Sequence, residues 1–290
     1  MRILVFGATG MLGHKMWQRL HQHFPDTFAT MRSPYADFAR CGLFQRDRII
    51  DQLDVADFHA AVRILDDVRP NVIVNCIAIT KRRGESADPL ASIELNAALP
   101  HRLASWSQAR GARLIHFSTD CVFNGQAGNY DESSPTTAED LYGRTKALGE
   151  VDVVGVLTLR TSLIGRELKG RTELLEWLLA QGGRTIHGYR KALYTGVSTL
   201  FMSDLVIEIL QQFPGLSGIY QVAAPVISKY ELLRLARDAF RLDVDIQPDD
   251  SVVMRRNLNG IRFREATGIA VPHWSKMMDA IEADPTPYEH

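Results

Sequence analysis

The chain has 290 residues, and its 33 Lys and Arg nearly balance its 34 Asp and Glu, which gives a net charge of -1 and no electrostatic reason to expect a nucleic-acid polymer or an anionic membrane as partner. This length can bury a full core without disulfides, and the three cysteines form no CxxC metal or redox pair. No run approaches the ~20 apolar residues of a membrane span and no signal peptide is recognised, so we expect a cytoplasmic protein without a metal site.

The first residues combine a strand, a glycine-rich turn and a helix. Arg2–Phe6 is typical of a buried strand, Gly7–Gly13 reads GATGMLG, and His14–His21 is helical in pattern. We interpret the first glycine as permitting a sharp turn, the second as leaving room for a pyrophosphate, and the third as letting the helix pack against the strand. The free N–H groups at the start of the helix would then bind the phosphates of a dinucleotide.

A second strand is predicted over Thr27–Met31, and Arg32 and Ser33 follow it. At this place a protein that binds NAD carries an acidic residue for the ribose 2′-hydroxyl. A guanidinium at Arg32 suits a 2′-phosphate instead, and Ser33 can add a hydrogen bond, so NADPH is favoured and NADH stays open. The alternative interpretation is a solvated arginine in a loop.

Residues 34–50 show no clear period and predict a loop or a broken helix. Leu53–Val55 is interpreted as a short strand with Asp54 placed to meet an adenine. A helix over 56–68 then leads into Asn71–Ala78, which is apolar nearly throughout, like a parallel strand buried on both faces. Small residues at the end of that run would flank the cofactor.

The segment Thr80–Asp88 is polar and basic, and at the carboxyl end of a central strand Lys81 and Arg82 can meet the phosphates of a sugar nucleotide. The alternative is a solvated basic surface. A helix over 90–108 and a strand over 113–117 follow. This alternation of strands and helices predicts a right-handed, doubly wound parallel sheet, the Rossmann-type α/β fold.

Polar residues follow that strand. Ser118 and Thr119 stand at its end, and Tyr142 and Lys146 are four residues apart, hence on one face of a helix. A tyrosine with a pKa near ~10 is a poor acid–base group at neutral pH, but an adjacent ammonium stabilises the phenolate and lowers that pKa. A YxxxK pair alone occurs by chance in many helices, but together with the glycine turn it indicates a catalytic site.

Four motifs carry a resemblance to a known family: GATGMLG at 7–13, STDCVFNG at 118–125, LYGRTKALGE at 141–150 and LRTSLIGR at 159–166. With them the chain resembles the extended short-chain dehydrogenase/reductase family and, within it, the dTDP-4-dehydrorhamnose reductase group. The resemblance covers nearly the whole chain and implies Thr119, Tyr142 and Lys146 as the catalytic residues. The expected cofactor surface comprises Gly7, Thr9, Gly10, Met11, Leu12, Arg32, Ser33, Asp54, Val55, Cys76, Ile77, Ala78, Ser118, Tyr142 and Lys146.

The second half is expected to build a smaller lobe over the cofactor. We predict a dinucleotide-binding domain over 1–165, to which a helix over 199–212 returns, and a mainly substrate-binding lobe over 166–290. Helices are also expected over 173–179 and 229–240, and a strand over 219–222. The expected substrate contacts are Lys81, Arg82, Thr119, Asp120, Cys121 and Arg256. The oligomeric state is left open, with a homodimer as one alternative.

The resemblance implies an NADPH-dependent reductase of the 4-keto group of a nucleotide-linked deoxysugar. Tyr142 would donate a proton, Thr119 would hold the carbonyl oxygen, and Lys146 would tune the tyrosine and bind the nicotinamide ribose. The group commonly carries a tyrosine where this chain has Cys121, which leaves the identity of the sugar open. The alternatives are an epimerase or dehydratase with bound NAD and a non-catalytic regulatory relative. Dehydratases usually carry an acidic pair beside the serine–threonine, where this chain has Asp120 alone, so simple reduction is favoured.

Overall fold

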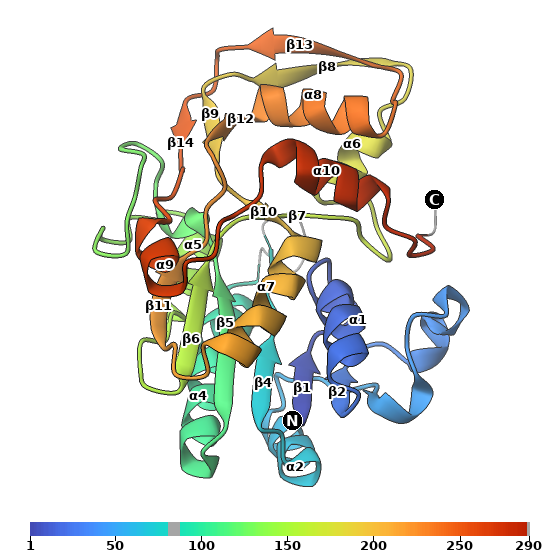
Figure 1. The fold of residues 1–290 in the computed structure, drawn as a ribbon, viewed down its shortest axis with the longest axis vertical. Coiled ribbons are helices and arrows are strands. Elements are labelled where there is room, and N and C mark those ends of the chain that lie inside the picture. Colours follow the sequence, from blue (N-terminus) through green and yellow to red (C-terminus); the bar gives the residue numbers. More distant parts are fainter. Residues whose placement is uncertain (81–87, 289–290) are drawn as a thin grey trace.

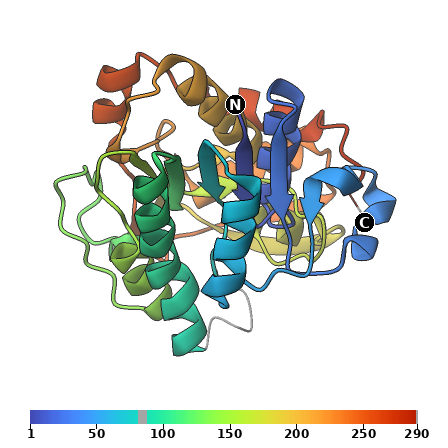
Figure 2. The same cartoon turned by 90° about the horizontal axis from the view of Figure 1, so that it is seen from below.

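The computed structural model describes residues 1–80 and 88–288. Its largest sheet consists of β1 (Ile3–Phe6), β2 (Thr27–Thr30), β3 (Ile49–Ile50), β4 (Val72–Asn75), β5 (Arg113–Ser118), β6 (Val156–Arg160) and β11 (Gly218–Gln221). All seven are parallel, in the order β11-β6-β5-β4-β1-β2-β3 (Figures 1 and 2). From β1 the chain first adds β2 and β3 on one side, and it then adds β4, β5, β6 and β11 on the other side. The expected doubly wound sheet is therefore confirmed.

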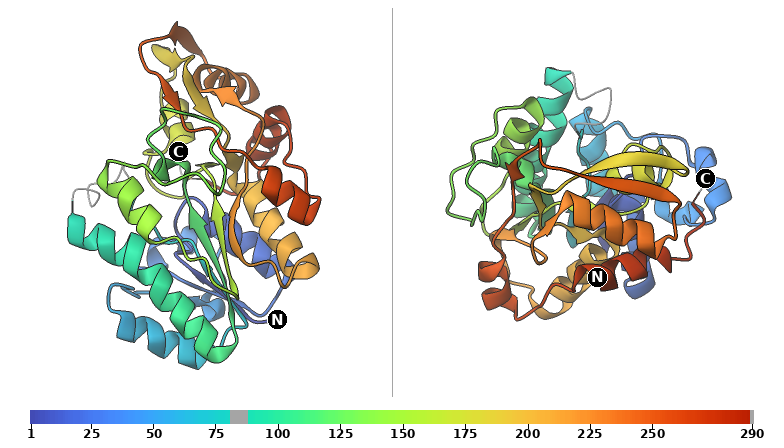
Figure 3. Two further views of the ribbon diagram at one scale, coloured as in Figure 1. Left: turned by 90° about the vertical axis from the view of Figure 1, so that its left-hand side faces the viewer. Right: turned by 90° about the horizontal axis from the view of Figure 1, so that it is seen from above.

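Helices cover both faces of this sheet because its central strands are apolar on both. Ile3 and Val5 of β1 pack into one core cluster. Leu4 and Phe6, which point the other way, pack into a second. The covering helices are α1 (Gly13–His23) and α7 (Thr199–Gln212) on the first face, and α2 (Phe58–Val68) and α4 (Leu99–Arg110) on the second (Figure 3).

A smaller part lies beyond the carboxyl ends of the central strands (Figure 1). Its elements are β7 (Leu163–Ile164), α6 (Leu174–Leu179), β8 (Arg184–Tyr189), β9 (Ala192–Tyr194), β10 (Val197–Ser198), β12 (Ile227–Ser228), α8 (Lys229–Ala239), β13 (Val244–Asp249), β14 (Met254–Arg255) and α10 (Trp274–Glu282). Helix α9 (Ile261–Thr267) packs beside β11 of the large sheet. Strand β8 pairs with β13, β9 lies between β12 and β14, and β7 pairs with β10. The sequence predicted helices in this part but neither β8 nor β13.

The third strand of the large sheet differs from the sequence prediction. Leu53–Val55 is not a strand, and β3 lies earlier, where it pairs with Ala29 and Thr30 of β2. Gln52 explains the difference, because its φ of 57° is left-handed and ends the extended backbone. The preceding segment contains three short 3₁₀ helices, as a broken helix predicts: η1 (Tyr35–Asp37), η2 (Ala39–Cys41) and η3 (Arg46–Arg48).

The helix predicted over 90–108 is divided into α3 (Pro89–Ser92), a π-helical turn η5 (Ile93–Ala98) and α4. Asn96 in that turn is fully buried, and its amide bonds both the N–H and the carbonyl of Ile79, at 2.9 and 3.0 Å. A Cβ on Gly149 would lie 1.9 Å from the Asn96 carbonyl oxygen, so the chain packs closely against the widened turn. The turn thereby anchors the segment that follows β4.

Across the part of the chain that the structure describes, no helix is long and apolar enough to cross a bilayer. Within the same residues, no group of three or more His, Cys, Asp or Glu side chains is placed to hold a metal ion.

Candidate active site

The turn after β1 shows a separate role for each of its three glycines. Gly7 has a φ of +83°, and a Cβ there would lie 2.8 Å from Ile77 Cγ1. A Cβ on Gly13 would lie 1.9 Å from the Gly7 carbonyl oxygen, so α1 can begin this close to β1 only without a side chain. For Gly10 the nearest atom to such a Cβ is 3.6 Å away. The middle glycine therefore leaves an open face beside the positive end of α1, as a bound pyrophosphate requires.

Further predicted cofactor residues lie beside this turn. Cys76 donates its backbone N–H to the Phe6 carbonyl at 3.0 Å, so residues 76–78 run along the end of β1. Arg32 is exposed and Ser33 half-buried just beyond β2. Because β1, β2 and β4 are parallel neighbours, their carboxyl ends meet at one edge and bring these residues together. Burial raises the pKa of the Cys76 thiol, which keeps it uncharged at neutral pH.

Asp54 and Val55 occupy different environments. Asp54 is exposed beyond β3, and its carboxylate accepts the Ala56 N–H at 3.1 Å. Val55 is 6% exposed and packs into the core with Leu53 and Leu65. A ligand at this edge can therefore meet the side chain of Asp54, but only the backbone of Val55.

Ser118 belongs to a buried polar network. Its hydroxyl donates to Glu150 Oε1 at 2.6 Å, and Arg160 donates to both oxygens of the same carboxylate at 2.8 and 2.7 Å. The Arg160 guanidinium also lies 5.0 Å from the centre of the Phe123 ring. A cofactor contact from Ser118 would thus come through its backbone. Sequence reasoning missed Glu150 and Arg160 as partners, although both stand inside the motifs, because only their pairing in space shows what they do.

Thr119 and Tyr142 come together at the end of β5. The Thr119 side chain is close enough to Tyr142 to act against the rise in the tyrosine pKa. Thr119 Oγ1 also accepts the Cys121 N–H at 3.2 Å, at the start of η6 (Asp120–Val122). Tyr142 stands in the first turn of α5 (Leu141–Leu148), which Asp140 caps by accepting the Gly143 N–H at 3.0 Å. A Cβ on Gly143 would lie 2.2 Å from the Cys121 carbonyl oxygen, so glycine lets α5 approach η6 closely.

The environment of Tyr142 favours the protonated phenol. Burial raises its pKa, the nearby Cys121, Asp120 and Glu173 act in the same direction, and Thr119 acts against them. The sequence-based expectation of a lowered tyrosine pKa is therefore wrong for this structure. Glu173, which accepts a hydrogen bond from Thr80 Oγ1 at 3.3 Å, was not predicted because it lies outside every motif. At neutral pH the phenol is held in the form that can donate a proton.

Lys146 lies in a buried polar row, where it is 2% exposed. Its Nζ donates to the Phe117 carbonyl at 2.7 Å and lies 3.4 Å from His116 Nε2. His116 Nδ1 in turn lies 3.2 Å from Asn75 Nδ2. Burial lowers the pKa of Lys146 to about 8, with Glu150 acting in the opposite direction. Burial and the Lys146 charge hold the pKa of His116 well below its usual value, so its imidazole is neutral. Sequence reasoning missed His116, which reads as an ordinary strand residue.

The predicted substrate residues gather beside Thr119. Asp120 is buried and Cys121 half-buried in η6. Arg256, from the smaller part of the chain, donates from Nη1 to Cys121 Sγ at 3.4 Å. The smaller part therefore contributes a guanidinium to the wall of the site. Two further predicted substrate residues lie outside the described residues: Lys81 and Arg82.

The doubly wound sheet and the open glycine turn define a Rossmann-type α/β protein. The chain matches the family model described as RmlD substrate binding domain over residues 1–186, and it belongs to that family. The family expected from the four sequence motifs is thereby confirmed.

Proteins similar to this chain carry different names. A probable dTDP-4,6-dihydroxy-2-methyloxan-3-one 4-ketoreductase of Streptomyces antibioticus is 32% identical over 88% of this chain and 83% of that protein. A dTDP-4-dehydrorhamnose reductase of Streptomyces griseus is 34% identical over 54% of this chain and 46% of its own length. Methionine adenosyltransferase 2 subunit beta of Mus musculus is 31% identical over 60% of this chain, and the match spans only 49% of that subunit.

Solved structures extend the likeness of fold over nearly the whole chain. The dTDP-4-dehydrorhamnose reductase from Bacillus anthracis, in complex with NADP, has a TM-score of 0.78 at 19% identity and covers 97% of this chain and 98% of its own. The Bordetella bronchiseptica enzyme WbmH, in complex with NAD+, has a TM-score of 0.75 at 16% identity, with 97% of both chains covered. At these identities the likeness shows the fold alone.

Proposed function

We propose that the chain reduces the 4-keto group of a nucleotide-linked deoxysugar with NADPH. The observation that carries the proposal is the proximity of Thr119 and Tyr142 at the same sheet edge as the open glycine turn. The relatives named as a 4-ketoreductase and as a dTDP-4-dehydrorhamnose reductase support this choice. Cys121 and Arg256 beside Thr119 supply a polar wall for the sugar nucleotide.

The reaction assigns one task to each residue of the pair and to the lysine. NADPH, when bound, supplies the hydride that reduces C4. Tyr142 donates its proton to the developing alkoxide, and its raised pKa keeps that proton available. Thr119 holds the carbonyl oxygen by a hydrogen bond. Lys146, still an ammonium at neutral pH because its pKa is about 8, supports the negative charge and binds the nicotinamide ribose.

The cofactor site is assigned to the turn Gly7–Leu12, to residues 76–78 and to the end of β2. Gly10 provides the open cradle for the pyrophosphate. Arg32 and Ser33 select NADPH through its 2′-phosphate, and NADH is a possible weaker substitute. Two similar structures hold NADP in one case and NAD+ in the other, so the fold accommodates both.

We assign residues 1–165 to the dinucleotide-binding part, with α7 and β11 returning to it, and most of 166–290 to the substrate-binding part. The return of β11 to the edge of the large sheet, beside β6, supports the first assignment. The contact of Arg256 with Cys121 supports the second, because it carries the smaller part to the catalytic pair.

A non-catalytic subunit is the second candidate function, favoured by the identity of 31% to methionine adenosyltransferase 2 subunit beta. An epimerase or dehydratase that retains its NAD is the third. The three differ in what happens to NADPH. A reductase consumes it with a keto sugar, an epimerase converts the sugar without consuming it, and a regulatory subunit binds it without turnover.

The test follows NADPH oxidation with dTDP-linked and UDP-linked 4-keto-6-deoxy sugars. Steady oxidation with at least one of them, matched by the appearance of a reduced sugar nucleotide, supports the reductase. Epimerisation of a UDP-sugar without net oxidation contradicts it. Tight NADPH binding with no conversion of any sugar leaves the non-catalytic subunit as the better assignment.

A further inference from the structure

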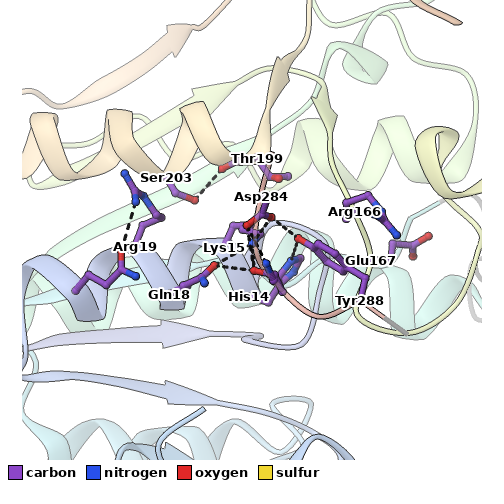
Figure 4. A network of polar contacts seen from close by, with 12 residues as sticks. His14, Lys15, Gln18, Arg19, Arg166, Glu167, Thr199, Ser203, Asp284 and Tyr288 are labelled. Carbon is purple, nitrogen blue, oxygen red and sulfur yellow. Dashed lines mark hydrogen bonds and ion pairs between the residues drawn. The ribbon is translucent and has the colours of Figure 1, made fainter. Parts of the chain in front are cut away.

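The last residues that the structure describes lie on the helix that follows the glycine turn. Residues 283–288, here called the C-terminal tail, come after α10 and contact α1 (Figure 4). Asp284 and Tyr288 of the tail meet Lys15 and His14 of α1. All four side chains are nearly or fully enclosed, with Lys15 1% and Tyr288 9% exposed. The tail is therefore part of the packing behind the turn.

Lys15 of α1 is buried against the tail. Its ammonium pairs with Asp284 and also bonds Gln18 Oε1 at 2.9 Å and the Thr286 hydroxyl. Burial lowers the pKa of Lys15, and Asp284 opposes that effect. Burial alone would raise the pKa of Asp284, but hydrogen bonds from Lys15 and Tyr288 lower it. Because a buried charge without a partner is strongly unfavourable, the ion pair holds the tail against the helix.

A second row of contacts runs from the tail to the middle glycine. The Tyr288 hydroxyl lies 2.8 Å from Asp284 Oδ2 and 3.1 Å from His14 Nε2, and it can donate its one hydrogen to either acceptor. His14 Nδ1 lies 2.9 Å from the Gly10 carbonyl oxygen, which can only accept, so this contact is a hydrogen bond when Nδ1 carries the hydrogen. The Arg166 guanidinium, 4.4 Å from the centre of the Tyr288 ring, holds that ring in place.

The orientation of one peptide group connects this row to the open face of the turn. The structure describes no cis peptide among its residues, so the Gly10 carbonyl and the Met11 N–H point in opposite directions. The Gly10 carbonyl accepts the His14 backbone N–H at 3.1 Å and lies 2.9 Å from the ring Nδ1, so both contacts direct it toward α1 and leave the Met11 N–H directed outward. Gly10 is also where the turn has open space. A contact that holds the Gly10 carbonyl toward His14 therefore also holds the Met11 N–H toward the expected position of the phosphates.

We propose that the C-terminal tail is a positioning element for the dinucleotide. Through Tyr288 and His14 it fixes the peptide between Gly10 and Met11 in the orientation that binds a pyrophosphate. This inference rests on the dinucleotide binding of the proposed function but not on any sugar. Tyr288 and His14 act on the cofactor through Gly10, so they are positioning residues and not catalytic ones.

The experiment compares Tyr288→Phe with Arg19→Gln. The first keeps the ring beside Arg166 and removes only the hydroxyl. The second removes an ion pair from the same helix, since Arg19 Nε lies 2.6 Å from Asp204 Oδ1, but on its exposed side and away from the turn (Figure 4). Each variant is measured for its NADPH dissociation constant, for the amide exchange rate of residues 7–14 without ligand, and for its melting temperature.

Tyr288→Phe is expected to raise the NADPH dissociation constant roughly three- to tenfold, as the loss of one internal hydrogen bond allows, and to speed amide exchange in the turn. Arg19→Gln is expected to change neither beyond about twofold, as for an exposed pair. If Tyr288→Phe lowers only the melting temperature, or if both variants lose affinity alike, the inference is overturned. Tight NADPH binding by an unmodified chain that reduces no sugar nucleotide would contradict the proposed function alone.

Discussion

Tyr142 is the residue whose proton the proposed reaction uses. Burial and the nearby Cys121 and Asp120 raise its pKa, so it carries that proton at neutral pH. Tyr142→Phe is expected to lower turnover roughly 10²-fold or more, because only the acid is lost, with dinucleotide affinity nearly unchanged. Steady-state kinetics and cofactor titration measure the two effects. Tyr130→Phe is the matched control, since that ring stacks 4.0 Å from Phe123 outside the pair. Near-normal turnover in Tyr142→Phe would remove the tyrosine from the mechanism.

Lys146 has a proposed function, but the burial of its charge lowers the stability of the folded chain. Its pKa in the folded chain is about 8, against an ordinary value of 10.5, because burial disfavours the ammonium. Between these values the unfolded chain binds more protons than the folded chain. The free energy of unfolding should therefore rise as pH rises from about 8 to 10.5. Below about pH 8 the full penalty is present, and it amounts to roughly 3 kcal/mol at most.

Lys146→Met tests this penalty. The variant removes the buried charge but also the donor to the Phe117 carbonyl, a loss of about 1 kcal/mol. We expect the variant to be more stable than the unmodified chain at pH 7 and inactive as a reductase. We also expect its alkaline rise in stability to be smaller, with the remaining rise coming from Lys15, whose pKa burial also lowers. Urea unfolding at a series of pH values measures the stability at pH 7 and its change at alkaline pH. A reductase assay measures the activity. A variant less stable at pH 7 would mean that the hydrogen bonds of Lys146 outweigh its burial.

At the scale of elements, the contact between α1 and β1 depends on glycine. Gly13→Ala would place a Cβ 1.9 Å from the Gly7 carbonyl oxygen, so α1 must shift. We expect a loss of stability of about 1–3 kcal/mol, as for an overpacked core. Gly10→Ala meets its nearest atom only at 3.6 Å, so its melting temperature should stay near normal while its methyl group obstructs the phosphates. Thermal unfolding and NADPH titration separate the two effects. Equal effects of both substitutions on both properties would contradict this division.

The end of β2 governs the choice of cofactor in our proposal. Arg32 is exposed there, and a guanidinium binds a 2′-phosphate through charge-assisted hydrogen bonds of roughly 1.5–3 kcal/mol. Arg32→Ala should therefore weaken NADPH binding about ten- to a hundredfold and barely change NADH binding. Parallel titrations with the two dinucleotides give the contrast. If the unmodified chain binds both equally, or if the variant loses both alike, Arg32 does not select the cofactor.

Helices and strands were predictable where the local sequence shows the spacing of apolar residues that is typical of them. The apolar spacing over 199–212 predicts α7 with its observed bounds, and the apolar run over 71–78 contains β4. Strands β8 and β13 are mostly polar on their exposed faces, pair across a long stretch of chain, and in β13 include Pro248, which argues against a strand by sequence alone. Their existence depends on tertiary pairing that no local pattern carries.

The candidate site was predictable in part for the same reason. Thr119 and Tyr142 stand in motifs, and the structure brings them together. The hydrogen bond of Lys146 to the Phe117 carbonyl depends on the path of a strand and on the depth of the site. The contact between His14 and Tyr288 joins positions 274 residues apart, so neither end indicates the other.

At the scale of the whole molecule, the chain returns to its first part after building much of the second. After β8, β9 and β10, α7 packs beside α1 and β11 joins the sheet beside β6. The tail then comes back to α1 through Asp284 and Lys15. A boundary near residue 165 therefore separates the two functions that we propose. It does not separate two independently packed units, because elements after residue 165 pack against elements before it.

Residues 1–165 alone are therefore expected not to fold cooperatively. Without β11, β6 becomes an unpaired edge strand, and without α7 the buried apolar side chains between α1 and α7 meet water. Each such large apolar side chain contributes roughly 1.5–3 kcal/mol when buried, and Lys15 also loses Asp284. Circular dichroism against temperature should show a sharp transition for the full chain and a broad one, without near-ultraviolet signal, for the fragment. A sharp transition with native near-ultraviolet signal in the fragment would instead make residues 1–165 an independent domain.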